Sequence, residues 1–300
     1  MSGAHANQYQ LLKERRFLPM FLVQLLGAAN DNIFKFSFTL LATYAASAWG
    51  GVDERVAGFL IGALFIAPFL LFSATSGQLA DRLDKAWLTR RVKEAEIAIM
   101  TLAAIGFIAQ AAALLYVCVF LMGLHSTVFG PVKYAYLPQH LDMQELTGGN
   151  GMVEMGTFVA ILIGTIVGGS LIGAGAGGET RAAILVLCVA VLGRIAAAFV
   201  PSSPSADPQL RIDPNPVAET WRNLKLAHER VAVFNALLGI SWLWFFGSIF
   251  LTSFTPFAKD VLGGNPAVVT LLLGVFSVGI GIGSLMCERL SGRKVEIGLV

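Results

Sequence analysis

The stretch GQLADRLDK, Gly77–Lys85, is a short charged segment that separates two long apolar runs. Apolar residues dominate the rest of the 300-residue chain as well: 56% are hydrophobic, 13% are charged, and the mean hydropathy is +0.71. Soluble domains contain about 25% charged residues, whereas a helix that crosses a bilayer needs roughly 20 apolar residues in a row. The sequence therefore predicts an all-α membrane protein in which Gly77–Lys85 includes the end of one span and the start of the loop that follows it.

Apolar runs of spanning length recur outward from this loop in both directions. With a window of about 19 residues, we expect spans near 17–46, 56–80, 94–112, 115–138, 149–173, 181–200, 231–257 and 266–287. The apolar run from 94 to 139 is about twice as long as one span needs, so we divide it at 110–116. Gly164 and Gly168 in the fifth span form a G-x-x-x-G, which predicts close packing against a neighbouring helix.

A linker follows the sixth span, because PSSPSADPQLRIDPNP at 201–216 is too rich in proline to continue a helix. Beyond it, Val217, Trp221 and Leu224 share one face of a short helix. That face suits an amphipathic helix on the membrane surface and equally a linker helix packed against the bundle. We expect three parts: six helices at 1–200, a linker with this helix at 201–230, and the start of a second helical part at 231–300.

Basic residues predict the orientation of the chain. Lys and Arg concentrate near the N-terminus, in 82–93, in 211–230 and in 289–294, and we count Lys93 among the loop residues. The alternate loops contain only Arg55, Arg181 and Lys259. Because Lys and Arg accumulate in cytoplasmic loops, we expect the N-terminus in the cytoplasm.

Other function classes find little support in the sequence. A net charge of +2, with no basic run interleaved with aromatic residues, argues against a nucleic-acid partner. The three cysteines lie in apolar runs without metal-ligand spacing, so we expect no disulfide framework, metal or cofactor. The motifs G-x-S-x-G, G-x-x-x-x-G-K and H-E-x-x-H are missing, so we expect no catalysis within these residues.

Polar residues interrupt the first apolar run, where GAANDNIFKF at 27–36 carries Asn30, Asp31, Asn32 and Lys35. Asp31 and Lys35 are four residues apart and share one helix face. A charge at mid-bilayer costs about 2.5 kcal/mol or more, so it must face a cavity or another charge.

Two further charges interrupt later spans, Lys133 in the fourth and Glu154 in the fifth. The intramembrane charges either line a polar cavity that binds a ligand or form the pairs Asp31–Lys35 and Lys133–Glu154, which would hold helices together. His125, in the fourth span, has no acid four residues away, so we expect it to make a structural hydrogen bond rather than to couple protons.

The loop at 77–85 resembles a signature of the major facilitator superfamily, Gly-x-Leu-x-Asp-Arg-x-Gly followed by basic residues. Gly77, Leu79, Asp81, Arg82 and Lys85 match it, whereas Asp84 stands where the family has Gly. The resemblance implies a conformational latch at Gly77, Asp81, Arg82 and Lys85. It also implies that superfamily's helix bundle, here the first six-helix half plus about two helices of the second half, with four more spans needed to complete it.

A narrower resemblance involves HSTVFGPVKYAYLPQHL at 125–141 and ELTGGNGMVEMGTFVAILIGTIVGG at 145–169. Together with NDNIFKF, these stretches are similar to the lysophospholipid transporter branch of the superfamily, which includes proteins fused to an acyltransferase and an acyl-carrier-protein synthetase. The resemblance implies that lysophospholipid, typically lysophosphatidylethanolamine, moves across the bacterial inner membrane to the inner leaflet for reacylation.

Such cargo is zwitterionic, so its site needs an acid for the ammonium and a cation for the phosphate. Asp31 and Glu154 offer the acids, Lys35 and Lys133 offer the cations, and Asn30 and Asn32 offer polar groups beside them. The alternatives are an exporter of drugs or other small solutes, the membrane module of a fused or associated acyltransferase, and a receptor or scaffold without transport. The H-x-x-x-x-D motif of the fused acyltransferases is missing from these residues.

Overall fold

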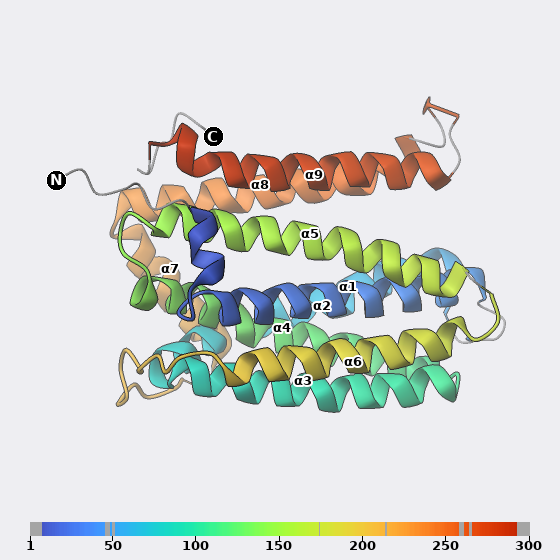
Figure 1. The fold of residues 1–300 in the computed structure, drawn as a ribbon, viewed down its shortest axis with the longest axis horizontal. Helices are drawn as coiled ribbons and strands as arrows, with labels where there is room; N and C mark the ends of the chain where they lie inside the picture. The colour runs from blue at the N-terminus through green and yellow to red at the C-terminus, as the bar shows by residue number, and fades with distance from the viewer. Residues whose placement is uncertain are drawn as a thin grey trace.

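A computed structural model describes residues 8–45, 49, 52–173, 175–213, 215–257, 261–263 and 266–292. Their regular structure is helical, and the long helices lie side by side along one direction (Figure 1). The elements are η1 (Gln8–Lys13), α1 (Leu18–Tyr44), α2 (Glu54–Arg82), α3 (Lys85–Ile108), α4 (Ala112–His140), α5 (Leu146–Gly173), α6 (Gly178–Ala198), α7 (Pro216–His228), α8 (Val231–Pro256) and α9 (Pro266–Leu290). The all-α fold predicted from the sequence is confirmed.

The division of the long apolar run between 94 and 139 is also confirmed. Helix α3 ends at Ile108 and α4 begins at Ala112. The chain reverses at Gln110, whose φ of 52° lies in the left-handed region that non-glycine residues rarely adopt. Within the described part of the chain, four helices, α2, α4, α5 and α6, are long and apolar enough to cross a membrane by length and composition.

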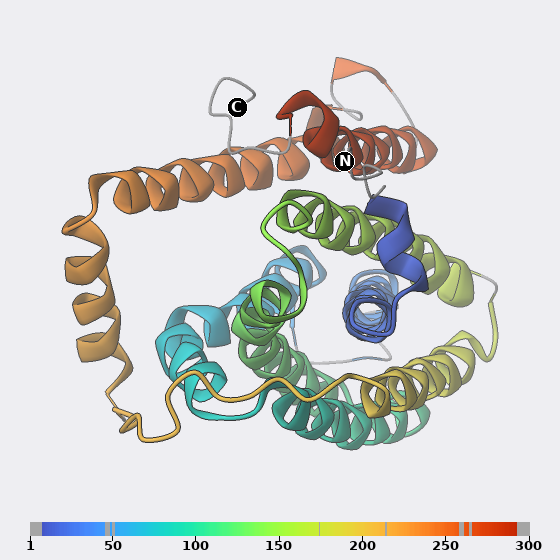
Figure 2. The same ribbon diagram turned by 60° about the vertical axis from the view of Figure 1, so that its left-hand side comes forward.

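Helix α1 occupies the interior of the bundle. It packs against α2, α4, α5 and α6, and Figure 2 shows these helices arranged around it. Large side chains such as Phe34 and Phe38 on α1 are fully buried in the core, together with Met100 of α3 and Leu115 of α4. Polar groups on α1 are therefore shielded from lipid by neighbouring helices.

Glycines bring α5 into contact with the α1 backbone. A Cβ atom at Gly164 would lie 2.6 Å from Ala29 O, and one at Gly168 would lie 2.8 Å from Ile33 O. Ser37 Oγ donates a hydrogen bond of 3.2 Å to Gly168 O at the same crossing. The close packing predicted from G-x-x-x-G is thus confirmed, and the neighbour is α1.

One end of the bundle carries the start of α1, the α2–α3 loop, the α4–α5 turn and the linker at 201–215; we call it the basic end. The linker lies against the last turn of α2, where Ala206 N and Asp207 N donate to Asp81 O at 2.9 and 3.0 Å. Helix α7 then contacts α2, while the apolar face formed by Val217, Trp221 and Leu224 is exposed. Helix α9 packs along α5.

Candidate functional site

Asp31 lies near the middle of α1 and is 8% exposed. Its Oδ2 accepts a hydrogen bond of 2.7 Å from Ser126 Oγ of α4. Its Oδ1 is buried and has no hydrogen-bond partner among the described residues. Asp31 therefore presents one tethered oxygen and one open acceptor inside the bundle.

Asn30, the preceding residue, reaches a different helix. Its Nδ2 donates a hydrogen bond of 2.7 Å to Glu96 Oε1 of α3, and its Oδ1 has no partner among the described residues. The amide orientation follows from chemistry, because an ionised carboxylate can only accept hydrogen bonds. Asn30 thus holds α1 to α3 and leaves a second open acceptor.

Glu96 belongs to a buried group that we call the α3–α4 triad, formed by Lys93, Glu96 and His125. Lys93 Nζ lies 2.5 Å from Glu96 Oε2, and His125 Nε2 of α4 lies 3.3 Å from the same oxygen. The side chains of Lys93 and Glu96 are completely buried. A Cβ atom at Gly27 of α1 would lie 2.6 Å from Lys93 Nζ, so this glycine makes room for the ammonium.

The position of Lys93 corrects the sequence interpretation. The sequence predicts that Lys93 is one of the charges of a loop at 82–93, which is wrong because Lys93 lies inside α3 and faces α1. The available signal was the spacing to Glu96, since opposite charges three residues apart share a helix face. His125 also has an acidic partner, which comes from α3 rather than from its own helix.

Lys35 lies one turn after Asp31 but does not form an ion pair with it, although both side chains belong to the described part of the chain. Its Nζ lies 3.7 Å from the centre of the Phe65 ring of α2, a cation–π contact. Asn32 lies beside α5, where a Cβ atom at Gly164 would lie 2.9 Å from Asn32 Cβ, and its Nδ2 donates a hydrogen bond of 2.7 Å to Ala28 O of its own helix.

Lys133 and Glu154 lie closer to the basic end and meet through a tyrosine. Tyr134 OH donates a hydrogen bond to Glu154, and Lys133 Nζ lies 4.8 Å from the centre of the Tyr134 ring. Although both are described, Lys133 and Glu154 form no direct ion pair. The structure therefore places four predicted residues, Asn30, Asp31, Asn32 and Lys35, on α1 and the other two in a separate group between α4 and α5.

His125 also lines a groove of about 480 Å³ between α3 and α4. The other lining residues are apolar except for Arg91. A volume of this size falls in the range of about 300–1,000 Å³ that is typical of ligand pockets. His125 thus contacts an apolar groove and the buried Glu96 carboxylate at the same time.

The loop predicted within 77–85 is wrong in extent, because 77–82 belong to the end of α2, Lys85 is the first residue of α3, and only Leu83 and Asp84 lie between them. This segment binds the linker. Lys85 is 1% exposed, its N donates to Ser203 O at 2.9 Å, and its Nζ donates to Pro204 O at 3.2 Å. Arg82 is exposed, and a Cβ atom at Gly77 would meet nothing within 4 Å among the described residues. No described helix therefore approaches Gly77 closely, and the latch role of this segment remains a prediction.

Asp84, which replaces the family glycine, anchors both α3 and the linker. Its carboxylate caps α3 by accepting from Trp87 N at 2.7 Å, and it also accepts from Ser202 Oγ at 2.8 Å and Ser203 N at 2.9 Å. Burial raises the pKa of Asp84, but these hydrogen bonds outweigh burial and hold the pKa below its usual value. The departure from the family pattern has a structural use.

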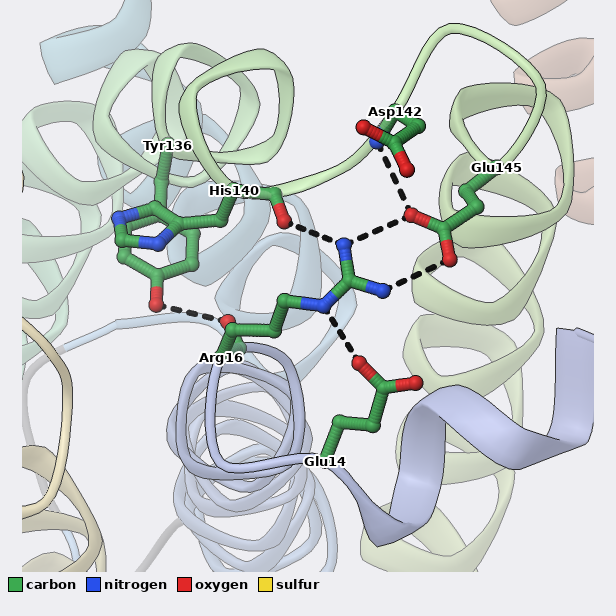
Figure 3. Close-up of polar contacts among 6 residues, drawn as sticks. All are labelled: Glu14, Arg16, Tyr136, His140, Asp142 and Glu145. Carbon is green, nitrogen blue, oxygen red and sulfur yellow. Dashed lines mark hydrogen bonds and ion pairs between the residues drawn. The ribbon is translucent and has the colours of Figure 1, made fainter.

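Arg16, just before α1, joins three segments at the basic end (Figure 3). Its Nη1 and Nη2 donate to both carboxylate oxygens of Glu145 at 2.7 Å, Nη1 also donates to His140 O at 2.7 Å, and Nε pairs with Glu14. Tyr136 OH donates to Arg16 O at 2.8 Å. Hydrogen bonds from Arg16 hold the pKa of Glu145 below its usual value, and those with Glu145 raise the pKa of Arg16.

Apolar helices that enclose ionised and polar side chains define a multi-pass membrane protein with a polar site in its interior. The chain belongs to the Major Facilitator Superfamily, whose family model matches residues 20–299. The chain is also similar to curated members that are named lysophospholipid transporters.

Three relatives illustrate this similarity, each named lysophospholipid transporter LplT. The chain is 25% identical to the relative from Serratia proteamaculans over 284 residues, which cover 93% of this chain and 67% of the relative. It is 24% identical to the relative from Enterobacter sp. over 305 residues, which cover 96% of this chain and 69% of the relative. It is 26% identical to the relative from Salmonella paratyphi B over 288 residues, which cover 91% of this chain and 65% of the relative. The chain thus spans about two thirds of the length of these relatives.

Proposed function

We propose that the protein transports lysophospholipid, with lysophosphatidylethanolamine as its main cargo, and delivers it to the inner leaflet for reacylation. The names of the relatives support the cargo class. Within the chain, the observation that carries the proposal is Asp31 Oδ1, a buried acceptor without a hydrogen-bond partner among the described residues. Leaving such a group unpaired costs about 1–3 kcal/mol, and a donor on the cargo would recover that free energy.

The headgroup chemistry fits the two charges on α1. An ethanolamine ammonium has three donors for Asp31 Oδ1 and for the open Asn30 Oδ1. The phosphate carries a negative charge, and Lys35 lies one turn away on the same face of α1. Lys35 is held by an aromatic ring rather than by an ion pair with Asp31, so it can exchange Phe65 for a phosphate oxygen.

Cargo reaches this site only after a rearrangement, because Asp31 is 8% exposed in this conformation. We place the parts at 1–200 and 231–300 in two halves that rock around a midplane site, with the N-terminus and the basic end in the cytoplasm. Lys133 and Glu154, which lie nearer that end than Asp31, would line the path of the cargo. Gly77, Asp81, Arg82 and Lys85 would act as the latch during the motion.

Replacement of Asp31 tests the proposal. In membrane vesicles that contain the full-length protein, Asp31→Asn should reduce the uptake of labelled lysophosphatidylethanolamine at least tenfold, since hydrogen bonds to charged groups contribute about 1.5–3 kcal/mol. Lysophosphatidylglycerol has no ammonium, so its uptake should fall less in this variant. Wild-type uptake of lysophosphatidylethanolamine by the variant would refute the site.

Ser170→Ala is the matched control, because Ser170 is exposed and its Oγ donates to Ile166 O of its own helix. This variant should transport like the wild type. Competition distinguishes the exporter alternative: unlabelled lysophospholipid should reduce uptake, whereas an excess of soluble drugs or solutes should not.

A further inference from the structure

We propose that the α3–α4 triad, Lys93, Glu96 and His125, positions Asp31 for cargo binding by fixing the rotation of α1 through Asn30. The inference rests on the proposed function, in which Asp31 binds the headgroup. It assigns these three residues a role without contact to the cargo.

Two consecutive residues determine the rotation of α1. Side chains of neighbouring residues in an α-helix point about 100° apart, and here Asn30 bonds to α3 while Asp31 bonds to α4. A rotation of α1 that moved Asp31 Oδ1 away from its present direction would break the bond between Asn30 and Glu96. The two bonds together therefore define where the open oxygen of Asp31 points.

The triad holds Glu96 in the place that Asn30 needs. Glu96 directs Oε1 to Asn30, while Oε2 accepts from Lys93 at 2.5 Å and lies 3.3 Å from His125 Nε2. On α4, Ser126 follows His125, and its Oγ lies 3.5 Å from His125 Nδ1 and donates to Asp31. A continuous set of contacts thus leads from Lys93 to Asp31 across α1, α3 and α4.

The packing around Lys93 argues that the triad does more than stabilise the bundle. A completely buried ion pair adds little net stability, and apolar residues of similar volume often replace such a pair without loss. Yet a glycine on another helix makes room for it: a Cβ atom at Gly27 of α1 would lie 2.6 Å from Lys93 Nζ. What an apolar pair could not supply is the acceptor for Asn30.

Two double variants of the full-length protein isolate that acceptor. In the Gln variant, Lys93→Met with Glu96→Gln, both charges are removed, but the new side-chain amide oxygen can still accept from Asn30. In the Leu variant, Lys93→Met with Glu96→Leu, the volume is similar and the acceptor is gone. We expect the KM for lysophosphatidylethanolamine to rise about tenfold in the Leu variant and to stay within threefold of wild type in the Gln variant, with similar maximal rates per folded protein.

A second measurement reports the rotation of α1 without any cargo. In a background without other cysteines, single Asp31→Cys and Asn32→Cys reporters are labelled with a small thiol reagent. The Leu variant should lower the ratio of labelling at 31 to labelling at 32 at least threefold, and the Gln variant should restore it. This ratio remains decisive even if wild-type protein shows no saturable lysophospholipid uptake, an outcome that would refute the proposed function instead.

The outcomes separate the roles. Equal KM values and equal labelling ratios in the two variants would make the triad a purely structural tie and overturn the proposal. A raised KM with an unchanged labelling ratio would mean that Glu96 contacts the cargo directly, which also overturns it. A raised KM with a shifted ratio in the Leu variant, both recovered in the Gln variant, supports positioning.

Discussion

At the scale of single residues, the charges of this protein find partners in two different environments. Lys93 and Glu96 are sealed inside the bundle, whereas Arg16 and Glu145 lie at the basic end and remain partly exposed. The Arg16 guanidinium binds both oxygens of Glu145, a planar two-point contact that lysine could not reproduce. It holds the start of α1 to the turn before α5.

This contact predicts a pH dependence of stability. The folded-state pKa of Glu145 is depressed, so its contribution is present above its usual value of about 4.5 and is lost as the pH falls through the folded pKa. Glu145→Gln should lower the unfolding free energy by about 1 kcal/mol at pH 7. In thermal unfolding of the detergent-solubilised protein, the difference in stability between this variant and wild type should shrink steadily below pH 4.5. A stability difference that stays constant down to about pH 3 would contradict this prediction.

At the scale of elements, the contact between α1 and α5 depends on small residues rather than on interlocking large ones. Gly164 and Gly168 face main-chain oxygens of α1, which cannot move aside as a side chain would. Close backbone approach of this kind is a common way for helices to associate in lipid, where burying apolar surface gives no driving force between them.

Gly164→Val should therefore separate α1 from α5 and lower the unfolding free energy by about 1–3 kcal/mol, the usual cost of overpacking. Gly62→Val in α2 is the matched control, because a Cβ atom there would meet nothing within 4 Å among the described residues. Thermal unfolding of both variants, measured by size-exclusion chromatography after heating, checks the comparison. Equal losses in the two variants would contradict the α1–α5 packing.

Helix α3 shows where hydropathy alone misplaced a boundary. The apolar window put its span at 94–112, but the helix begins at Lys85, capped by Asp84. Its first turns contain Lys85, Lys93 and Glu96, which reduce hydropathy although they are buried. Hydropathy cannot distinguish a polar residue in water from one that is enclosed by other helices, so the sequence predicted a loop there.

The candidate site was predictable from the sequence only in part. Asp31 and Lys35 stood out because charges inside an apolar run are costly. The partners of α1 were not predictable, since Asn30 bonds to Glu96 and Asp31 to Ser126, which are distant in sequence. Such pairs depend on which helices are neighbours, and no helical periodicity reports that.

At the scale of the whole molecule, the six-helix bundle meets the later helices through α5 and α9. A Cβ atom at Gly151 of α5 would lie 2.6 Å from Ser284 O of α9, and Gln8 Nε2 of η1 donates to Leu285 O at 3.0 Å. Both contacts lie at the basic end; the first is between main chains, and the second runs from a side-chain amide to a main-chain oxygen.

A disulfide between Gly151→Cys and Ser284→Cys should lock this contact. If transport requires the two parts to rock apart, oxidation of the double variant in the full-length protein should lower lysophospholipid uptake at least fivefold, and a reductant should restore it. Gly151→Cys alone should be insensitive to the oxidant. Full uptake by protein that is cross-linked, as judged by gel mobility, would exclude separation at this contact.

The linker is bound to the first helices, which limits how far the later helices can move away from them. Residues of Ser202–Asp207 form hydrogen bonds with Asp84 and with Asp81 O at the end of α2. Asp213 N donates a further hydrogen bond of 2.8 Å to Gln78 of α2. Once the Asp213 bond is released, the slack at 208–215 reaches at most about 28 Å when fully extended. Any larger displacement of the start of α7 must pull on the loop whose Asp84 starts α3, so motion of the later helices that moves α7 this far is transmitted to the helix that carries Lys93 and Glu96.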